Sequence, residues 1–211
     1  MTRWEPNARE RLERAALELF VEQGFAETTV PQITTRAGLT TRTFFRHFAD
    51  KREVLFANEG DIPAMAARMI AEAPASLTPM EVIVGGLEDV AAAQFSDGVE
   101  ALRARRAVIE SDEGLREREL RKLSALSEAI SRGFQDRGVD RLTAALVAQV
   151  TVTVFSVSIG RWLAADGETP LPELLHDTLA ALRAILAEPA PPSSVRGPKP
   201  EHGDPAALAG Q

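Results

Sequence analysis

The sequence predicts an all-α protein with a small N-terminal three-helix head and a larger C-terminal helical bundle. Along most of the 211 residues, apolar side chains recur at intervals of three and four, which is the period of an amphipathic helix. Ser, Thr, Asp or Asn repeatedly precedes these segments, at the position of a helix N-cap. No segment carries a competing strand pattern. Together these observations predict about nine or ten helices.

The first predicted helix runs from about Asn7 to Gln23. Asn7 can cap it, with Glu10 three residues later as the capping-box partner. Gly24 can end it, because glycine readily adopts the left-handed conformation of a helix C-cap. The apolar face of this helix can support the two shorter helices that follow.

A helix-turn-helix pattern comes next. Thr29 can cap the first short helix with Gln32 as its partner, and Pro31 is tolerated in a first turn, where no backbone N–H is needed. Gly38 can take the positive φ of the turn, and Thr40 can cap the second short helix. Two short helices joined in this way are typical of a DNA-reading element.

The second short helix has two distinct faces. Phe44 and Phe48 are four residues apart and share one face, whereas Thr41, Arg42 and Phe45 lie on another. One face can therefore pack against the head, and the other is free to enter a DNA groove.

The charge of this segment differs from that of the whole chain. The chain is acidic, with a net charge of −7 and a pI near 5.1, which alone argues against a nucleic-acid partner. From residue 36 to residue 52 the only acid is Asp50, and the bases are Arg36, Arg42, Arg46, Lys51 and Arg52. Such a strip suits a small DNA-reading element on a larger acidic body. A charge run can also be an ordinary solvated helix face.

The rest of the chain carries a series of helix start and stop signals. The start signals are Asp50 with Glu53, Thr78 with Glu81, Ser111 or Asp112, and Asp140, and Asp61-Ile62-Pro63 marks a break. They predict helices over about 62–72, 79–94, 99–109, 115–137, 142–163 and 172–186. We expect a head of residues 1–56, a helical bundle of residues 57–188 and, because six prolines follow residue 188, a disordered tail of residues 189–211.

Composition argues against several functional classes. The chain has no cysteine, and His47, His176 and His202 show no paired ligand spacing, so a metal site is not expected. It has no phosphate-binding glycine loop with a lysine and no Ser-centred nucleophile elbow, so we expect neither an enzyme nor a cofactor. Apolar stretches such as Val150–Val157 are short and interrupted by Thr and Ser, which predicts no membrane span and a cytoplasmic protein.

The N-terminal quarter resembles the tetracycline-repressor (TetR) family of bacterial transcription regulators. The resemblance lies in Leu19-Phe20, Gly24-Phe25, Thr28-Thr29, Ala37-Gly38-Leu39-Thr40, Thr43-Phe44-Phe45-Arg46-His47-Phe48 and Asp50-Lys51. The chain departs from the family pattern at Phe45, where tyrosine is usual, and at Pro31, near a position where a polar residue is sometimes found. Both departures affect which operator sequence the protein would read, and not whether it binds DNA.

The resemblance implies a homodimeric regulator that grips double-stranded operator DNA and, as a repressor, is released by a small lipophilic effector. By motif position, Thr41, Arg42 and Phe45 correspond to base-reading residues, and Thr43, His47 and Lys51 to phosphate contacts. Phe45 has packing beside Phe44 as its alternative role, and His47 a structural hydrogen bond. A helical protein–protein adaptor without specific DNA binding is the alternative function.

The effector is expected inside the bundle, between the helices that begin near residues 80, 99, 115 and 142. Its candidate lining is Met65, Met69, Leu87, Val90, Leu102, Leu126, Phe155 and Trp162. Taken singly, each of these residues is more typical of an ordinary helical core than of a ligand site. A charged cluster, Arg105, Arg106, Glu110, Arg116 and Arg118, could meet an anionic ligand group or form surface ion pairs.

The last two helices are apolar on more than one side and therefore need more than one neighbour. We expect helices 142–163 and 172–186 of each subunit to form a four-helix dimer interface, with Ala148 among the outward-facing residues.

Overall fold

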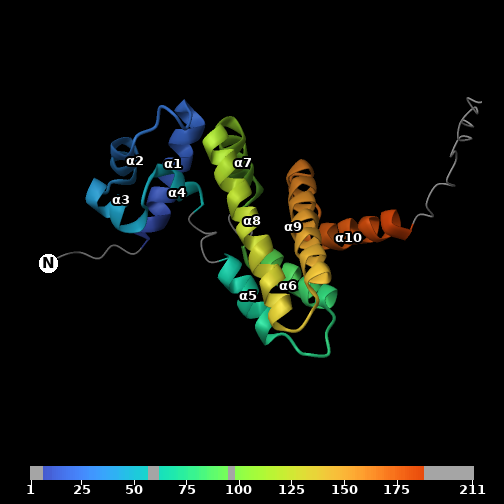
Figure 1. The fold of residues 1–211 in the computed structure, drawn as a ribbon. Helices are drawn as coiled ribbons and strands as arrows, with labels where there is room; N and C mark the ends of the chain where they lie inside the picture. The colour runs from blue at the N-terminus through green and yellow to red at the C-terminus, as the bar shows by residue number, and fades with distance from the viewer. Residues whose placement is uncertain (1–6, 57–61, 95–97, 188–211) are drawn as a thin grey trace, which may run out of the picture.

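The computed structural model describes residues 7–56, 62–94 and 98–187, and within these ranges the protein is all-α, as predicted (Figure 1). The ten helices of this part of the chain are α1 (Ala8–Gln23), α2 (Val30–Ala37), α3 (Thr41–His47), α4 (Lys51–Leu55), α5 (Ile62–Glu72), α6 (Pro79–Gln94), α7 (Val99–Ser111), α8 (Glu113–Asp136), α9 (Arg141–Ala164) and α10 (Leu171–Ala187). The predicted tail, and Asp61 in the predicted break, lie outside the described residues.

Most of the predicted helix starts are confirmed as N-caps. Thr29 and Gln32 form the complete capping box of α2, and the Thr40 hydroxyl accepts from the Thr43 N–H at the start of α3. The carboxylates of Asp50, Asp112 and Asp140 accept backbone N–H groups at the starts of α4, α8 and α9. These bonds satisfy N–H groups that have no partner within the helix.

The predicted capping box at the start of α1 is wrong. Asn7 adopts a left-handed backbone with φ 74°, and its side chain makes no cap hydrogen bond. The N–H group of a cap can meet its box partner only when the cap residue is extended. Asn7 is not extended, so the Asn-x-x-Glu spacing forms no box here.

The head is built on α1. Leu12 and Phe20 of α1, Ile33 of α2, and Phe44 of α3 are fully or almost fully buried in one cluster. That cluster also contains side chains from outside the head, namely Val108 and Ile109 of α7 and Leu115 of α8. The two parts of the chain therefore share apolar contacts across the predicted boundary at residue 56.

Helix α8 forms the centre of the body. It runs from the head to the far end of the body, where it packs against α5 and α9 (Figure 1). At that end the Arg137 guanidinium donates to the carbonyls of Ile70 at 2.7 Å, Ala73 at 2.6 Å and Pro74 at 3.0 Å, which closes the C-terminal end of α5. Helix α5 is thereby fixed to the end of α8.

Helix α9 is a single helix, as predicted for residues 142–163, and it is more apolar than its short apolar runs suggest. The Thr and Ser residues that were expected to interrupt its apolar runs lie within a single helix of 24 residues, with a mean hydropathy of 1.9 over its most apolar stretch. By length and composition such a helix could cross a membrane, and a core helix of a soluble protein has the same properties. One third of that stretch is buried inside this chain, where α9 packs against α8 and α10.

The expected outward position of Ala148 is wrong. Ala148 is fully buried and packs in a cluster with Ile70, Ile130 and Phe134, so it belongs to the core of its own chain. The large apolar residues of α9 that are exposed are Leu142, Leu146 and Val157. A helix that is apolar all round gives no periodic signal to show which face is buried, and that is why the sequence alone misplaced Ala148.

Candidate nucleic-acid interface

The turn between α2 and α3 is held by backbone geometry and by one arginine. Gly38 ends α2 in the left-handed conformation, φ 65°, as predicted for a glycine turn. The Leu39 N–H donates to the Thr34 carbonyl at 2.8 Å. From α1, the Arg11 guanidinium donates to the Ala37 carbonyl at 2.5 Å, which fixes the turn to the base of the head.

Helix α3 presents the two faces that its spacing predicts. Phe44 and Phe48 are buried, whereas Thr41 and Arg42 are exposed and Phe45 is 59% exposed. The ring of Phe45 meets that of Phe44 edge to face, with centroids 5.4 Å apart. Phe45 therefore packs against Phe44, the alternative role considered for it, while more than half of its surface stays exposed.

The two other polar candidates on α3 are half-buried. The Thr43 hydroxyl shares a hydrogen bond of 3.0 Å with the Thr40 hydroxyl. The His47 Nε2 lies 3.4 Å from the Arg46 guanidinium. Burial lowers the pKa of His47 below its ordinary value, and the charges of Arg46 and Arg9 lower it further against the opposing effect of Glu13. His47 is therefore neutral at neutral pH in the free protein.

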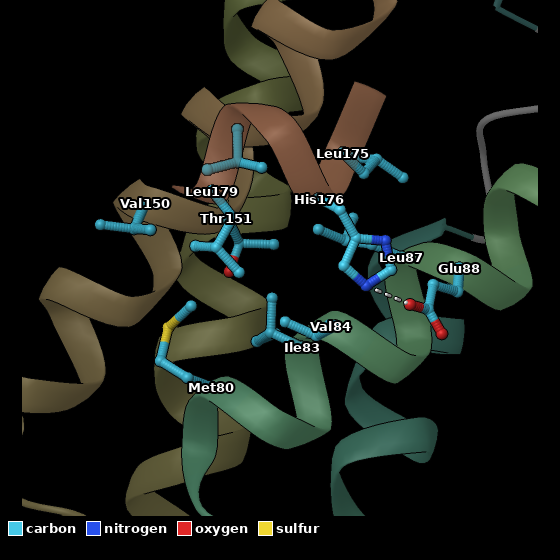
Figure 2. A pocket seen from close by; sticks show the side chains of 11 residues that line it. Met80, Ile83, Val84, Leu87, Glu88, Val150, Thr151, Leu175, His176 and Leu179 are labelled. Carbon is cyan, nitrogen blue, oxygen red and sulfur yellow. Dashed lines mark ion pairs between the residues drawn. The ribbon is translucent and has the colours of Figure 1, made fainter. Parts of the chain in front are cut away.

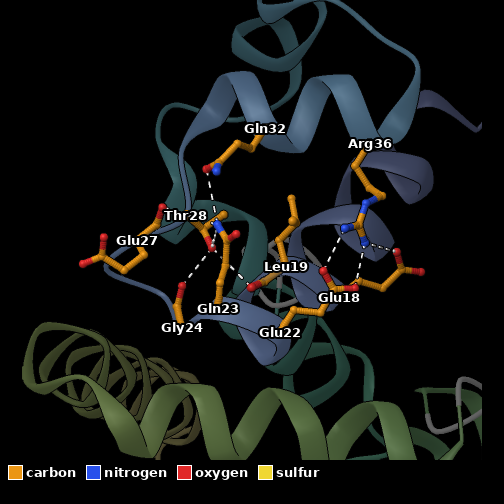
Figure 3. Close-up of polar contacts among 9 residues, drawn as sticks. All are labelled: Glu18, Leu19, Glu22, Gln23, Gly24, Glu27, Thr28, Gln32 and Arg36. Carbon is orange, nitrogen blue, oxygen red and sulfur yellow. Dashed lines mark hydrogen bonds and ion pairs between the residues drawn. The ribbon is translucent and has the colours of Figure 1, made fainter.

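One base of the predicted positive strip is neutralised by α1. The Arg36 guanidinium binds Glu22 through both nitrogens, at 2.9 and 2.8 Å, and Glu18 at 3.3 Å (Figure 3). These hydrogen bonds raise the pKa of Arg36 and lower that of Glu22. The strip is therefore less positive than the sequence suggests, since the acids that pair with Arg36 come from 14 and 18 residues earlier.

Lys51 lies in a different place from the other phosphate candidates. Its ammonium group donates to the carbonyls of Phe25 at 2.7 Å, Ala26 at 3.1 Å and Thr28 at 2.8 Å. It also lies 4.4 Å from the centre of the Phe25 ring. In the free protein Lys51 thus faces the turn between α1 and α2, which sequence reasoning did not foresee.

Helix α4 is attached to α8 at both of its ends. The Arg118 guanidinium lies 3.1 Å from the Glu53 carboxylate and 3.8 Å from that of Asp50. The Lys122 ammonium donates to the carbonyl of Phe56, the C-cap of α4, at 2.9 Å. Arg118 was predicted to be part of a charged cluster. In the structure it forms an ion pair that joins the body to the head. In the same cluster, Arg106 pairs with Glu110 at 2.8 Å.

The structure does not gather the predicted effector residues into one cavity. Leu87 lines a small apolar cavity between α6, α9 and α10, of about 20 Å³, roughly the room for one water molecule (Figure 2). Leu102, Phe155 and Trp162 pack in the cluster around α9 and α10, and Leu126 packs in the cluster around α5 and α8. Val90 is half-buried on α6.

The remaining two candidates lie elsewhere. Met65 and Met69 line an open groove of about 430 Å³ between α5 and α6. At the rim of the small cavity, the His176 ring lies 3.0 Å from the Glu88 carboxylate, so the two side chains join α10 to α6 (Figure 2). Sequence reasoning missed both residues of this pair, because neither belongs to an apolar stripe.

The N-terminal part of the chain is similar to known regulators. Residues 13–57 match the family described as bacterial regulatory proteins, tetR family. The HTH-type transcriptional regulator TcmR of Streptomyces glaucescens is 39% identical over 82 residues, which cover 39% of this chain and 36% of TcmR. The matched segment thus spans about a third of the length of that relative.

The similarity of the fold extends beyond the head. NalD, the secondary repressor of the MexAB-OprM multidrug efflux pump in Pseudomonas aeruginosa, aligns with a TM-score of 0.57 at 20% identity, over 82% of this chain and 96% of NalD. The TetR-family repressor FadR of Thermus thermophilus, in complex with lauroyl-CoA, aligns with a TM-score of 0.53 at 23% identity, over 88% of this chain and 98% of FadR. The arrangement of head and body is thus that of solved repressors.

Proposed function

We propose that the chain belongs to the TetR family of bacterial regulatory proteins and that it is a cytoplasmic transcriptional repressor that binds operator DNA as a homodimer. The observation that carries the proposal is the exposed face of α3, which carries Thr41, Arg42 and Phe45. The family is not one of enzymes, and no group of acidic or histidine side chains suited to a metal ion occurs among the described residues.

The chemistry of this face suits a major groove. An arginine can donate two hydrogen bonds to a guanine edge, and a phenyl ring or a threonine methyl can contact the methyl group of thymine. We assign base reading to Thr41, Arg42 and Phe45, and phosphate contacts to Thr43 and His47 at the border of the same face. Lys51 differs from these two because carbonyls of the head surround its ammonium group.

The proposed dimer interface is the uncovered side of α9 and α10. Leu142 is 70% exposed and Leu186 is 75% exposed, and both lie on the last two helices of the described chain. Burial by a second copy is most favourable for apolar side chains that the described part of their own chain leaves exposed. We propose residues 1–56 as the DNA-binding part and residues 57–188 as the part that dimerises and binds the effector.

A nuclease footprint on the native upstream region tests the proposal. Two recognition helices of a two-fold dimer must enter major grooves about 34–36 Å apart, so we expect protection of two inverted half-sites one helical turn apart. Protection of a single half-site would contradict the dimer, and recovery of no specific fragment would favour the adaptor function over DNA binding.

For the effector we propose a lipophilic molecule that carries an acyl chain. The cavity between α6, α9 and α10 is lined almost entirely by apolar side chains, such as Ile83, Leu87 and Val154. The solved structure of FadR of Thermus thermophilus, which has a similar fold, holds lauroyl-CoA. The cavity must widen to admit such a chain, and we propose that the His176–Glu88 pair at its rim separates as it does.

Calorimetry with lauroyl-CoA, with and without operator, should show mutual weakening. A ligand shifts a two-state equilibrium only by the difference in its affinity for the two states, and the coupling is the same in both directions. We therefore expect operator to weaken lauroyl-CoA binding by the factor by which lauroyl-CoA weakens operator binding. Coenzyme A without the acyl chain is the control and should bind weakly. An affinity for lauroyl-CoA that operator leaves unchanged would reject the switch.

A further inference from the structure

Lys51 completes the turn that leads from α1 into α2. Helix α1 ends at Gln23, and the turn passes through Phe25 and Thr28, both buried, before α2 begins at Val30. The Thr28 hydroxyl bonds back to the Gly24 carbonyl at 2.8 Å and the Leu19 carbonyl at 3.3 Å, which fixes one side of the turn (Figure 3). The carbonyls on the other side point to the Lys51 ammonium group.

The donors of Lys51 are fully used by this turn. An ammonium group has three N–H donors, and three carbonyls lie within 3.1 Å of it. Two of these bonds, to Phe25 and Thr28, are partly buried, whereas the one to Ala26 is exposed. A DNA phosphate could compete easily only for the donor that Ala26 holds, because the other two carbonyls would be left partly buried without a partner.

We infer that Lys51 is a positioning residue, which holds the α1–α2 turn in place and joins it to the first turn of α4, and is not a phosphate contact. The turn ends at Thr29, whose hydroxyl and amide bind Gln32 and start α2. The start of α2 and the start of α4 are thus tied to one side chain. Helix α3 packs against α2, so a shift of α2 would move α3. Operator affinity therefore depends on Lys51 through the position of α2.

The affinity measurement for Lys51 rests on the proposed DNA binding. The decisive variant is Lys51→Arg. Arginine keeps the charge and binds phosphate at least as well as lysine does, so a phosphate role predicts wild-type affinity. The guanidinium is larger and planar, so it cannot take the place of the compact ammonium group, whose single nitrogen lies within 3.1 Å of all three carbonyls, unless the turn moves. We therefore expect Lys51→Arg and Lys51→Met to lose operator affinity together, each on the order of tenfold.

Arg52→Met is the matched control, because it removes the same charge from the next residue, which is exposed. In the free protein, amide hydrogen exchange at Gln32 and Ile33, which bond to Thr29, should be faster in Lys51→Met and unchanged in Arg52→Met. This readout needs no DNA, so it remains decisive if the protein binds no operator. Wild-type operator affinity in Lys51→Arg, or unchanged exchange in Lys51→Met, would overturn the inference.

Discussion

Leu146→Glu is expected to convert the proposed dimer into a folded monomer and to lower operator affinity on the order of a thousandfold, toward non-specific binding. Leu146 is 58% exposed on the uncovered side of α9. In a dimer formed through this side, the new carboxylate would be buried without a partner, which is strongly unfavourable. Sedimentation velocity measures the assembly state, circular dichroism checks the helical content, and a binding titration gives the affinity.

Two further variants show whether the effect is specific to the proposed interface. Leu120 on α8 is 66% exposed, so Leu120→Glu places the same charge at a site of similar exposure and should leave the dimer intact. Ala148→Glu should unfold the chain, because Ala148 is fully buried within its own subunit. If Leu146→Glu stays dimeric, or if Leu120→Glu dissociates as readily, the interface lies elsewhere.

Arg42→Ala should cost on the order of 1–3 kcal/mol of operator binding, concentrated at one base pair. Arg42 is exposed in the first turn of α3, from which residues of a recognition helix reach base edges. Affinities for the operator and for single-base variants of it, measured at one fixed salt concentration, give the base preference. In the variant protein, the preference at the contacted base pair should disappear while preferences elsewhere are kept.

Arg46→Ala provides the comparison for Arg42→Ala, since it removes the same charge from the same helix. Arg46 lies in the last turn of α3, near His47, so its loss should weaken binding to all sequences by a similar factor. If Arg42→Ala behaves like Arg46→Ala and leaves base preference intact, the base-reading role of Arg42 is wrong.

The sequence predicted the helices well because their ends depend on local chemistry. A threonine or aspartate before a helix bonds to an N–H group two or three residues later, and Thr29, Thr40, Asp112 and Asp140 all do so. Asn7 is the exception, since the same residue pattern occurs with a left-handed backbone that forms no cap. Spacing indicates that a cap is possible, but the backbone conformation decides whether it forms.

Interactions between distant segments could not be predicted in this way. The acids that neutralise Arg36 lie on α1, and the carbonyls that bind Lys51 lie 23–26 residues earlier in the chain. In the bundle, the apolar residues proposed for the effector divide among a groove, a small cavity and two core clusters. Periodicity identifies residues that are buried, but it does not say which residues share a cavity.

The attachment of α8 at both ends makes it a lever. Its 24 residues span about 36 Å. Arg137, directly beyond its C-terminal end, holds α5, and Arg118 and Lys122 near its beginning hold α4. A tilt of about 5° around the α5 end would move the other end of such a rod by about 3 Å. A displacement too small to disturb packing near the pivot thus becomes a shift of atomic size beside α4, and in a two-fold dimer both heads would shift by the same amount.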